Sequence, residues 1–515
     1  MSSAFRRALP ARPDLEQQKK LAKELLRAYR ARDAEAVARI REQLPDKSEI
    51  SLTDAQFVLA REYGLANWRE LKERIGKLRV AMLPPIEQFK RAVQNRDARA
   101  LGDVLSHHAE VRASINAPIF GFDSTALVSS AGSNVEVVDV LLRYGADPNK
   151  KSEWWAGGFH PLYGATPAVA ERLIAGGAVI DACAAAHLDK LELLEEMIAA
   201  DPSRVHERGG DGKTPLHFAR SRAVVDLLLA SGADIDARDI DHRSTAAEWM
   251  LGDSPDEARL DLAKYLVERG AHADIFLAAA LGLTERARAM LEENPGLLRL
   301  RTSQGDYGEK KPSSYHVYQW TLGPNRSPLQ VAARYGQLET LDVMEQFATP
   351  QERLLLACHR GDRQKALAIV RDNEGIVANL GPVDRRALTD EAWTANAPAV
   401  ELMLELGFDP SQTTGSGPTG GTALHCASWE GSVACVAALL AHPSGRALIE
   451  TRDRMYNGTP LGWTAHGSLN CGNPNADHAE VARRLIEAGA TVDPNAEWHA
   501  SEAVQAVIED ALRPA

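Results

Sequence analysis

A four-residue motif that recurs along the chain constrains its fold more than any other feature. Thr214-Pro215-Leu216-His217 returns in related form elsewhere, and weaker copies share its pattern. The related copies occupy residues 125–128, 327–330, 422–425 and 459–462, and the weaker ones residues 160–163 and 245–248. A Thr side chain can accept hydrogen bonds from the first free N–H groups of a helix, and Pro suits the first helical position. Each copy therefore predicts the start of a helix.

The residues after each motif predict a second helix and a tight turn. A short Ala-rich helix, as in 331–333, is followed by a Gly such as Gly336 or Gly431 that turns the chain. Residues 224–229 then carry Leu and Val at helical spacing. A Gly-Ala ending, as at 145–146 and 232–233, places Gly where a helix stops in a left-handed conformation. Neither helix can bury its apolar face alone, so we expect the units to stack.

This unit resembles the ankyrin repeat, which has a hairpin finger, two antiparallel helices and a period of about 33 residues. Residues 417–442 and 325–345 carry the resemblance most closely. It extends over Pro85 to Asn495 in about twelve units, similar to the long arrays of bacterial ankyrin proteins. Units at 86–111, 182–206, 275–300 and 351–380 lack the motif, and those at 160–178 and 214–234 lose about one turn of the first helix. The resemblance implies an all-α ankyrin-repeat solenoid with short hairpin fingers.

Helical segments flank the repeats and suggest three parts of the chain. Residues 15–44 and 51–75 show two amphipathic patterns, and Ser51 with Asp54 offers a capping pair. Because a solenoid needs its ends covered, we expect an N-terminal helical cap over residues 1–80. The repeat array would then span 85–495, after Pro84-Pro85, and a capping helix would lie within 496–515.

Charge and hydropathy exclude two classes of partner. Lys and Arg number 59 against 71 Asp and Glu, which gives a formal net charge of −12. A protein that binds nucleic acid mainly through phosphate contacts needs a large basic surface, so nucleic acid is not an expected partner. No apolar run reaches the roughly 20 residues needed to span a bilayer, so no membrane association is expected.

Cysteine usage predicts a reducing environment. The five cysteines are few, odd in number and far apart, which fits neither a disulfide framework nor a zinc site with paired spacing. The basic residues near the N-terminus are not followed by the apolar core of a signal peptide. We therefore expect a cytoplasmic protein, and no sequence motif calls for a cofactor.

A row of side chains predicts a binding surface. In ankyrin proteins the fingers and first helices form a concave groove that binds partners, and the site after the Ala pair points into it. Successive units carry Ala280, Arg334, His359, Trp393, Trp429 and His466 at this site, and Tyr335, Arg360 and Glu430 at the next. Units stack at roughly 10 Å, so neighbours can share one ligand. Two adjacent tryptophans favour a binding surface, since large aromatic residues are enriched there. The alternative is that these side chains only pack against neighbouring fingers.

Three insertions interrupt the repeats. Residues 302–326 are far longer than a normal finger and carry Tyr318 and Trp320, which we predict to contact a ligand. Loops beyond about 12–15 residues are usually functional or disordered, and this one is too aromatic for a disordered linker. We expect it to fold over the groove as a lid or side wall; alternatively, it patches an irregular stack. Residues 152–160 are similarly aromatic, and residues 467–478 are polar.

A second cluster of polar residues lies in the middle of the chain. Glu248 stands where the ankyrin pattern places a His that bonds neighbouring loops, so it and His242 are candidate ligand-binding residues, whereas His217 and His425 are predicted to be structural. Asp and His residues here, at positions 211, 239, 241 and 242, could bind a metal. No spacing among them matches a known ligand motif, so no metal site is predicted.

Recognised catalytic motifs are absent from the sequence. It contains no GxSxG, GxxxxGK[ST] or HExxH pattern, and its Gly-rich segment 415–421 is interpreted as a flexible hairpin. Cys358 adjoins His359, but adjacent helical residues diverge by about 100°, so Cys358 is assigned to the core.

Two functions remain open from the sequence. The favoured one is binding of a partner protein or peptide in the concave groove. The alternative is a cofactor-independent hydrolase or lyase that acts on a small polar or aromatic molecule beneath the 302–326 loop. His359, Glu430 and His466 would then act as acid and base, because such groups need no cofactor.

Overall fold

The computed structural model describes residues 5–10, 12–132, 134–252, 257–414, 420–494, 496 and 498–512. Over these residues the regular structure is helical, apart from two isolated bridges, Phe120 with Ser124 and Lys310 with Ser313. The predicted all-α solenoid of helix pairs is therefore confirmed. The chain divides into two compact units, residues 1–181 and residues 182–515. Each unit is described separately.

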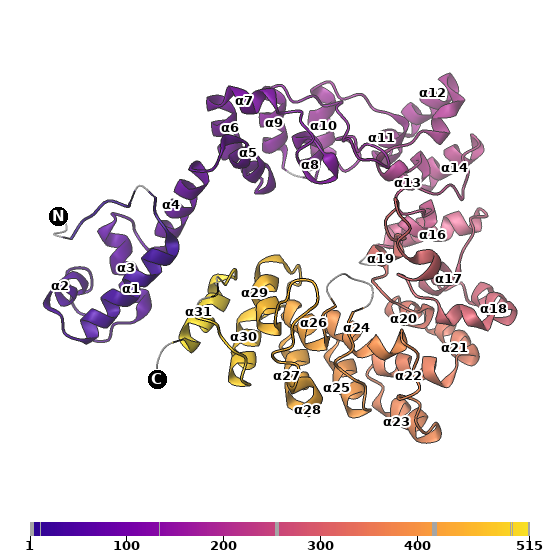
Figure 1. Cartoon of the computed structure of the whole chain (residues 1–515). Helices are drawn as coiled ribbons and strands as arrows, with labels where there is room; N and C mark the ends of the chain where they lie inside the picture. Colours follow the sequence, from indigo (N-terminus) through magenta and orange to yellow (C-terminus); the bar gives the residue numbers. More distant parts are fainter. Residues whose placement is uncertain are drawn as a thin grey trace. The chain divides into compact units, whose positions relative to one another are not determined.

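The first unit contains the N-terminal helices and the first repeats (Figure 1). Its helices are α1 (Leu15–Arg30), α2 (Ala34–Gln43), α3 (Leu52–Glu62), α4 (Trp68–Ala81), α5 (Pro85–Gln94), α6 (Ala98–His107), α7 (Ala109–Ala113), η1 (Gly121–Asp123), α8 (Ala126–Ser129), α9 (Val135–Arg143) and α10 (Pro167–Ala175). Each of the two amphipathic patterns proves to be two helices. The chain turns between them at Arg32 and Gly64, which have φ values of 61° and 76°. Ser51 and Asp54 form the predicted capping box at the start of α3.

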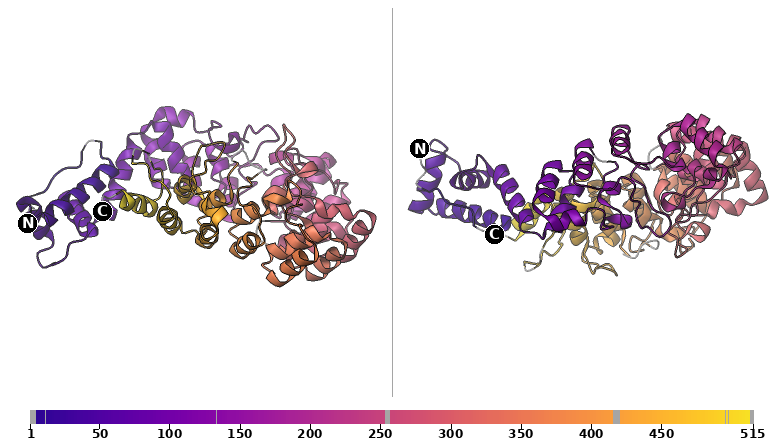
Figure 2. Two further views of the ribbon diagram at one scale, coloured as in Figure 1. Left: turned by 60° about the horizontal axis from the view of Figure 1, so that its bottom comes forward. Right: turned by 90° about the horizontal axis from the view of Figure 1, so that it is seen from above.

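The second unit contains the remaining repeats. Its helices up to the middle are α11 (Ala182–His187), α12 (Leu191–Ala200), η2 (Pro202–His206), η3 (Gly210–Gly212), α13 (Pro215–Phe218), α14 (Arg222–Ala230), α15 (Ala246–Trp249), α16 (Glu257–Glu268), α17 (Ile275–Leu281), α18 (Thr284–Glu293), η4 (Pro295–Arg299), η5 (Gly305–Tyr307) and α19 (Tyr318–Thr321). They continue as α20 (Pro328–Arg334), α21 (Leu338–Phe347), α22 (Pro350–His359), α23 (Arg363–Asp372), η6 (Asp384–Arg386), α24 (Ala387–Trp393), α25 (Ala397–Glu405), α26 (Ala423–Trp429), α27 (Val433–Ala441), α28 (Pro443–Arg446), α29 (Pro460–Asn470), α30 (His478–Glu487) and α31 (Glu502–Ala511). Within this unit the helix pairs follow one another side by side in chain order (Figures 1 and 2).

The recurring motif starts helices as its chemistry predicts. Thr422 and His425 form a capping box at the start of α26, and His425 Nε2 lies 3.1 Å from the carbonyl oxygen of Gly458 in the next finger. His217 makes the same contact with the carbonyl oxygen of Ser244 at 3.0 Å. Both histidines thus link one finger to the next, as expected of a structural role. The α13 helix has only four residues, which confirms the predicted loss of one turn.

Apolar side chains bury along the stack rather than in one globular core. From α22 to α31, one cluster of buried residues runs through every helix pair. Cys358 belongs to this cluster and is fully buried, and burial raises the pKa of its thiol to about 12. The Cys358–His359 pair is therefore not a nucleophile and its base, and Cys358 is a core residue as predicted.

Candidate functional site

An aromatic cavity opens in the C-terminal repeats of the second unit. It has a volume of about 480 Å³ and is lined by Trp393, Trp429, Tyr456, Gly458, Gly462, Trp463 and His466. The three indoles come from the neighbouring helices α24, α26 and α29, which pack side by side (Figure 1). The cavity thus arises where the stacking of three repeats aligns their first helices.

Trp463 forms the buried wall of this cavity and is 6% exposed. Its ring meets the indoles of Trp393 and Trp429 edge to face, at centroid distances of 6.2 Å in both cases. Edge-to-face packing of this kind is favourable beyond the burial of apolar area. The two outer indoles are half-buried, so part of their ring surface stays open at the cavity.

Two glycines make room for the Trp463 ring. A Cβ atom at Gly421 would lie 2.9 Å from the ring, and one at Gly458 would lie 3.2 Å from it. Any larger residue at Gly421 would therefore displace the indole. These glycines allow a large ring to occupy the helix position at which the preceding repeat carries the small residue Cys426.

The predicted row is brought together only in part. Trp393, Trp429 and His466 line the cavity, and the His466 ring lies 5.4 Å from that of Trp429. Among the lining residues of the described chain, neither His359 nor Glu430 is present. The proposed acid–base set of His359, Glu430 and His466 therefore does not converge on one space.

His359 and Glu430 have partners of their own. His359 Nδ1 lies 2.9 Å from Oε1 of Glu391, a carboxylate that is 1% exposed. Glu430 lies near Cys471, whose thiol is 3.8 Å from its Oε2, and burial raises the pKa of the Glu430 carboxyl. Both residues thus support the structure around the repeats that carry the cavity.

Glu391 sits at the centre of a buried polar network. Burial pushes the pKa of its carboxyl upward, but the hydrogen bond from His359 and the charge of Arg326 outweigh burial and hold the pKa below its usual range. Gln330 and Asn396 also donate to this carboxylate, at 3.2 and 2.7 Å. The network joins α20, α22 and α24 through side chains.

The other members of the row contact backbone, are buried or are exposed. Arg334 donates to the carbonyl oxygen of Leu322 at 2.7 Å, and Tyr335 donates to that of Gly252 at 3.1 Å. Ala280 is fully buried, whereas Arg360 is exposed. Arg334 and Tyr335 therefore anchor loops, and neither lines the aromatic cavity.

The 302–326 insertion packs into the stack and does not line the aromatic cavity. Tyr318 is fully buried, and its hydroxyl donates to Asp274 at 3.0 Å, as does that of Tyr307 at 2.8 Å. Burial raises the pKa of the Asp274 carboxyl, with the nearby charge of Glu248 as a further cause. Trp320, at 54% exposed, presents its ring to solvent. The geometry favours the alternative of an insertion that completes an irregular stack.

In the repeats of His217 and His425, the motif histidine contacts the next finger. At the same position Glu248 contacts His316 of the insertion instead. The His316 Nε2 lies 3.4 Å from Oε2 of Glu248, and both side chains are buried. The Glu248 carboxylate also accepts the N–H of Thr245 at 2.7 Å, in a capping box like that of the histidine repeats. Burial pushes the pKa of Glu248 upward, but its bond with His316 outweighs this and leaves the pKa lowered. Glu248 is thus a linker between motif and insertion.

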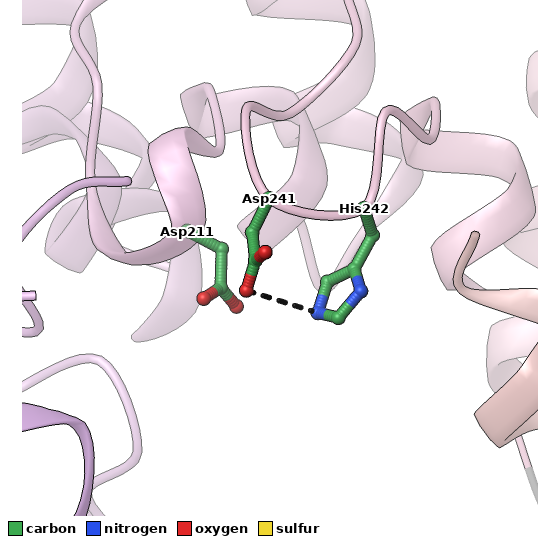
Figure 3. A group of neighbouring side chains, drawn as sticks. All are labelled: Asp211, Asp241 and His242. Atoms are coloured by element: carbon green, nitrogen blue, oxygen red, sulfur yellow. Dashed lines mark ion pairs between the residues drawn. The ribbon is translucent and has the colours of Figure 1, made fainter. Parts of the chain in front are cut away.

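His242 lies in a third polar group, with Asp211 and Asp241 (Figure 3). The imidazole Nε2 is 3.7 Å from Oδ2 of Asp241. These residues occupy two adjacent fingers, close to the half-buried Trp249 ring, which lies 5.1 Å from that of His242. The group is separate from the aromatic cavity.

Trp463 and Tyr456 are the cavity residues that sequence reasoning missed. Trp463 does not occupy the site after the Ala pair, and Tyr456 lies in a finger, where it is 65% exposed. A usable signal was present, because both Trp249 and Trp463 follow an Asp by ten positions, at Asp239 and Asp453. The Gly-rich hairpin interpreted at 415–421 lies mostly outside the described residues.

Comparison with known proteins supports the repeat architecture. A model of the ankyrin repeat family matches residues 211–240 and 419–454. The chain carries ankyrin repeats. A mouse (Mus musculus) protein, ankyrin repeat and SAM domain-containing protein 6, is 33% identical over 121 residues. That alignment covers 22% of this ankyrin-repeat chain and 13% of the mouse protein. None of the described helices is long and apolar enough to cross a bilayer.

Proposed function

We propose that this ankyrin-repeat protein binds a partner protein by accepting aromatic or apolar side chains of the partner in its aromatic cavity. Ankyrin repeats are in general modules of protein interaction, which supports a binding role. The observation that carries the proposal is the clustering of three indoles around a cavity of about 480 Å³. Tryptophan and tyrosine are enriched among residues that dominate binding energy.

The architecture of the cavity supports recognition of a side chain. Trp463 is buried and fixed by a hydrogen bond, so little conformational entropy is lost there on binding. Trp393 and Trp429 are half-buried, and Tyr456 stands exposed at the edge. A preformed apolar floor with a partly exposed aromatic rim matches the hydrophobic interior and accessible rim of protein interfaces.

The acid–base alternative has less support. Of its three candidate groups only His466 lines the cavity, while His359 bonds Glu391 and Glu430 lies against Cys471. The 302–326 insertion packs against Asp274 and Glu248, so its contacts lend no support to a lid over this cavity. The five unpaired cysteines favour the predicted cytoplasmic location, since disulfides are rare there.

Selection from a displayed peptide library tests the proposal. We expect wild-type protein to enrich peptides with Trp, Phe or Leu, and a chosen peptide to bind Trp429→Ala at least about tenfold more weakly, the effect of losing an aromatic hot spot. Trp320→Ala is the matched control, because it removes an exposed indole outside the cavity. Equal binding to Trp429→Ala and wild type, or loss of binding only in Trp320→Ala, would reject the cavity as the site.

A further inference from the structure

Three side chains of metal-ligand type converge far along the chain from the aromatic cavity. Asp211, Asp241 and His242 each offer a ligand atom, and these atoms all lie within 4.8 Å of one another (Figure 3). Asp211 lies in one finger, and Asp241 and His242 lie in the finger of the next repeat. The backbone N–H groups of Ile240 and Asp241 donate to the carbonyl oxygen of Asp211 at 2.8 and 3.2 Å. Backbone bonds therefore hold the three side chains in place.

His242 is oriented as histidine ligands commonly are. Its Nδ1 lies 2.9 Å from the carbonyl oxygen of Tyr315 in the insertion. A carbonyl only accepts, so we assign the imidazole proton to Nδ1. Nε2, the nitrogen that a metal would take, faces the carboxylate of Asp241, at 3.7 Å from Oδ2. A backbone carbonyl that fixes the tautomer in this way is the usual outer partner of a metal-bound histidine.

Among the described residues, the Asp241 carboxylate of this group has no Lys or Arg partner, in contrast to Asp211. Asp211 and Asp241 are 6% and 2% exposed. Lys213 Nζ pairs with Oδ2 of Asp211 at 3.1 Å. Besides His242, the Asp241 carboxylate has one contact among the described residues: its Oδ1 accepts the backbone N–H of Ser314 at 3.0 Å. A buried carboxylate is costly unless it is paired with a positive charge. Nε2 of His242 and Oδ2 of Asp241 lie 3.7 Å apart, so a cation between them could bind both atoms.

We propose that Asp211, Asp241 and His242 bind a divalent transition-metal ion, with Zn²⁺ as the preferred ion. Two carboxylates and one imidazole form a ligand set that suits Zn²⁺, and three protein ligands leave a position for water. Metal bonds of about 2.0–2.2 Å require the ligand atoms to approach to roughly 3.4 Å from one another, a small adjustment of side chains. The ion ties two adjacent fingers, and through Tyr315 the insertion, into one structure.

Zinc titration of the full chain tests the proposal. Metal-stripped protein is titrated with ZnCl₂ at pH 8.0 by isothermal calorimetry, and its thermal melting is followed with and without the ion. We expect one saturable site that raises the melting temperature. Asp241→Asn keeps an oxygen for Ser314 and should weaken Zn²⁺ binding by about tenfold or more, as should His242→Gln. His272→Gln, at an exposed histidine in the next repeat, should bind as wild type does.

Three outcomes would overturn the site. If wild-type protein shows no saturable Zn²⁺ binding, the proposed site does not bind the ion. Equal affinity in wild type and Asp241→Asn would place the ion elsewhere, for instance on Cys471, which is partly exposed. Melting that rises equally with Zn²⁺ in all variants would likewise exclude these ligands.

Discussion

The indole Nε1 of Trp463 donates a hydrogen bond of 2.9 Å to Oδ2 of Asp453. The same carboxylate accepts the backbone N–H groups of Met455, Tyr456 and Gly458, at 2.7 to 2.8 Å. Burial pushes the pKa of Asp453 upward, but these bonds outweigh burial and hold the pKa low. One buried carboxylate thus shapes the finger and fixes the wall of the aromatic cavity.

Trp463→Phe tests the importance of this bond. Phenylalanine keeps a ring in the cavity wall but removes the indole donor to Oδ2 of Asp453, which then keeps only the backbone N–H of Gly458 among its described donors. We expect the free energy of unfolding to fall by about 1.5–3 kcal/mol, the contribution of a hydrogen bond to a charged group. Urea unfolding followed by far-UV circular dichroism measures the change. Trp429→Phe is the control, because its indole nitrogen makes no hydrogen bond within the described structure; equal losses in both variants would contradict the role of the bond.

The same Asp–Trp pair occurs earlier in the array. Trp249 Nε1 donates to Oδ2 of Asp239 at 2.7 Å, and the buried ammonium of Lys213 lies 3.3 Å from the centre of its ring. In both repeats the Trp directly follows the position that holds His in the Thr-Pro-Leu-His motif, here Glu248 and Gly462. In both repeats, then, the motif histidine is replaced and an indole is present. The hydrogen bond from the indole to Asp is a second way of fixing the finger to its helix.

The fold was predictable because its determinants are local. Thr caps, Pro at the first helical position and left-handed Gly at helix ends act within a few residues, and Gly145 and Gly232 have the expected φ values of 90° and 91°. Stacking follows from the apolar faces that each unit leaves uncovered. No long-range contact had to be known.

The site was only half predictable because its key contacts are not local. The position after the Ala pair repeats in every unit, and it correctly predicts that Trp393, Trp429 and His466 lie together. The place of Trp463 depends on the space that Gly421 leaves in the preceding finger. His359 resembles a catalytic group in sequence, yet its partner Glu391 lies 32 residues away. The insertion bonds residues 240–244, more than 60 residues before it.

Arg326→Met tests the Glu391 network. Arg326 Nη1 lies 3.4 Å from Oε1 of the fully buried Glu391, so its loss leaves a buried charge that only a histidine and two amides support. We expect destabilisation of about 3–5 kcal/mol, as for other broken buried ion pairs. The double variant Arg326→Met with Glu391→Gln should recover part of this loss, because no buried charge remains. Guanidinium unfolding measures all three proteins, and a double variant no more stable than Arg326→Met would contradict the electrostatic account.

His316→Ala tests how the insertion is anchored. The substitution removes the partner of the buried Glu248 carboxylate. We expect a lower melting temperature and faster trypsin cleavage at Lys310 within the insertion. Because the folded pKa of Glu248 is depressed, the stability from this pair is present above its unfolded pKa and is lost as pH falls through the folded pKa. The melting difference between variant and wild type should therefore shrink in acid. Unchanged cleavage would show that other contacts hold the segment.

His217→Gln tests the pH dependence of the finger contacts. Nδ1 of His217 accepts the N–H of Thr214 at 3.1 Å, and Nε2 faces the carbonyl oxygen of Ser244, so the ring is neutral when folded. Burial lowers the pKa of His217 to about 4. A depressed folded pKa adds stability that is complete above the unfolded value of about 6.5 and is lost as pH falls toward 4. Because of this histidine, the free energy of unfolding of the wild type should be about 2 kcal/mol lower at pH 5.0 than at pH 7.5.

Glutamine at position 217 can still donate to Ser244 but does not titrate. The variant should be less stable than wild type at pH 7.5, and this gap should narrow by pH 5.0. Urea unfolding at both pH values measures the gap, with His272→Gln as the control at an exposed histidine. If the gap stays constant between the two pH values, the proton balance at His217 does not contribute to the acid sensitivity of the fold.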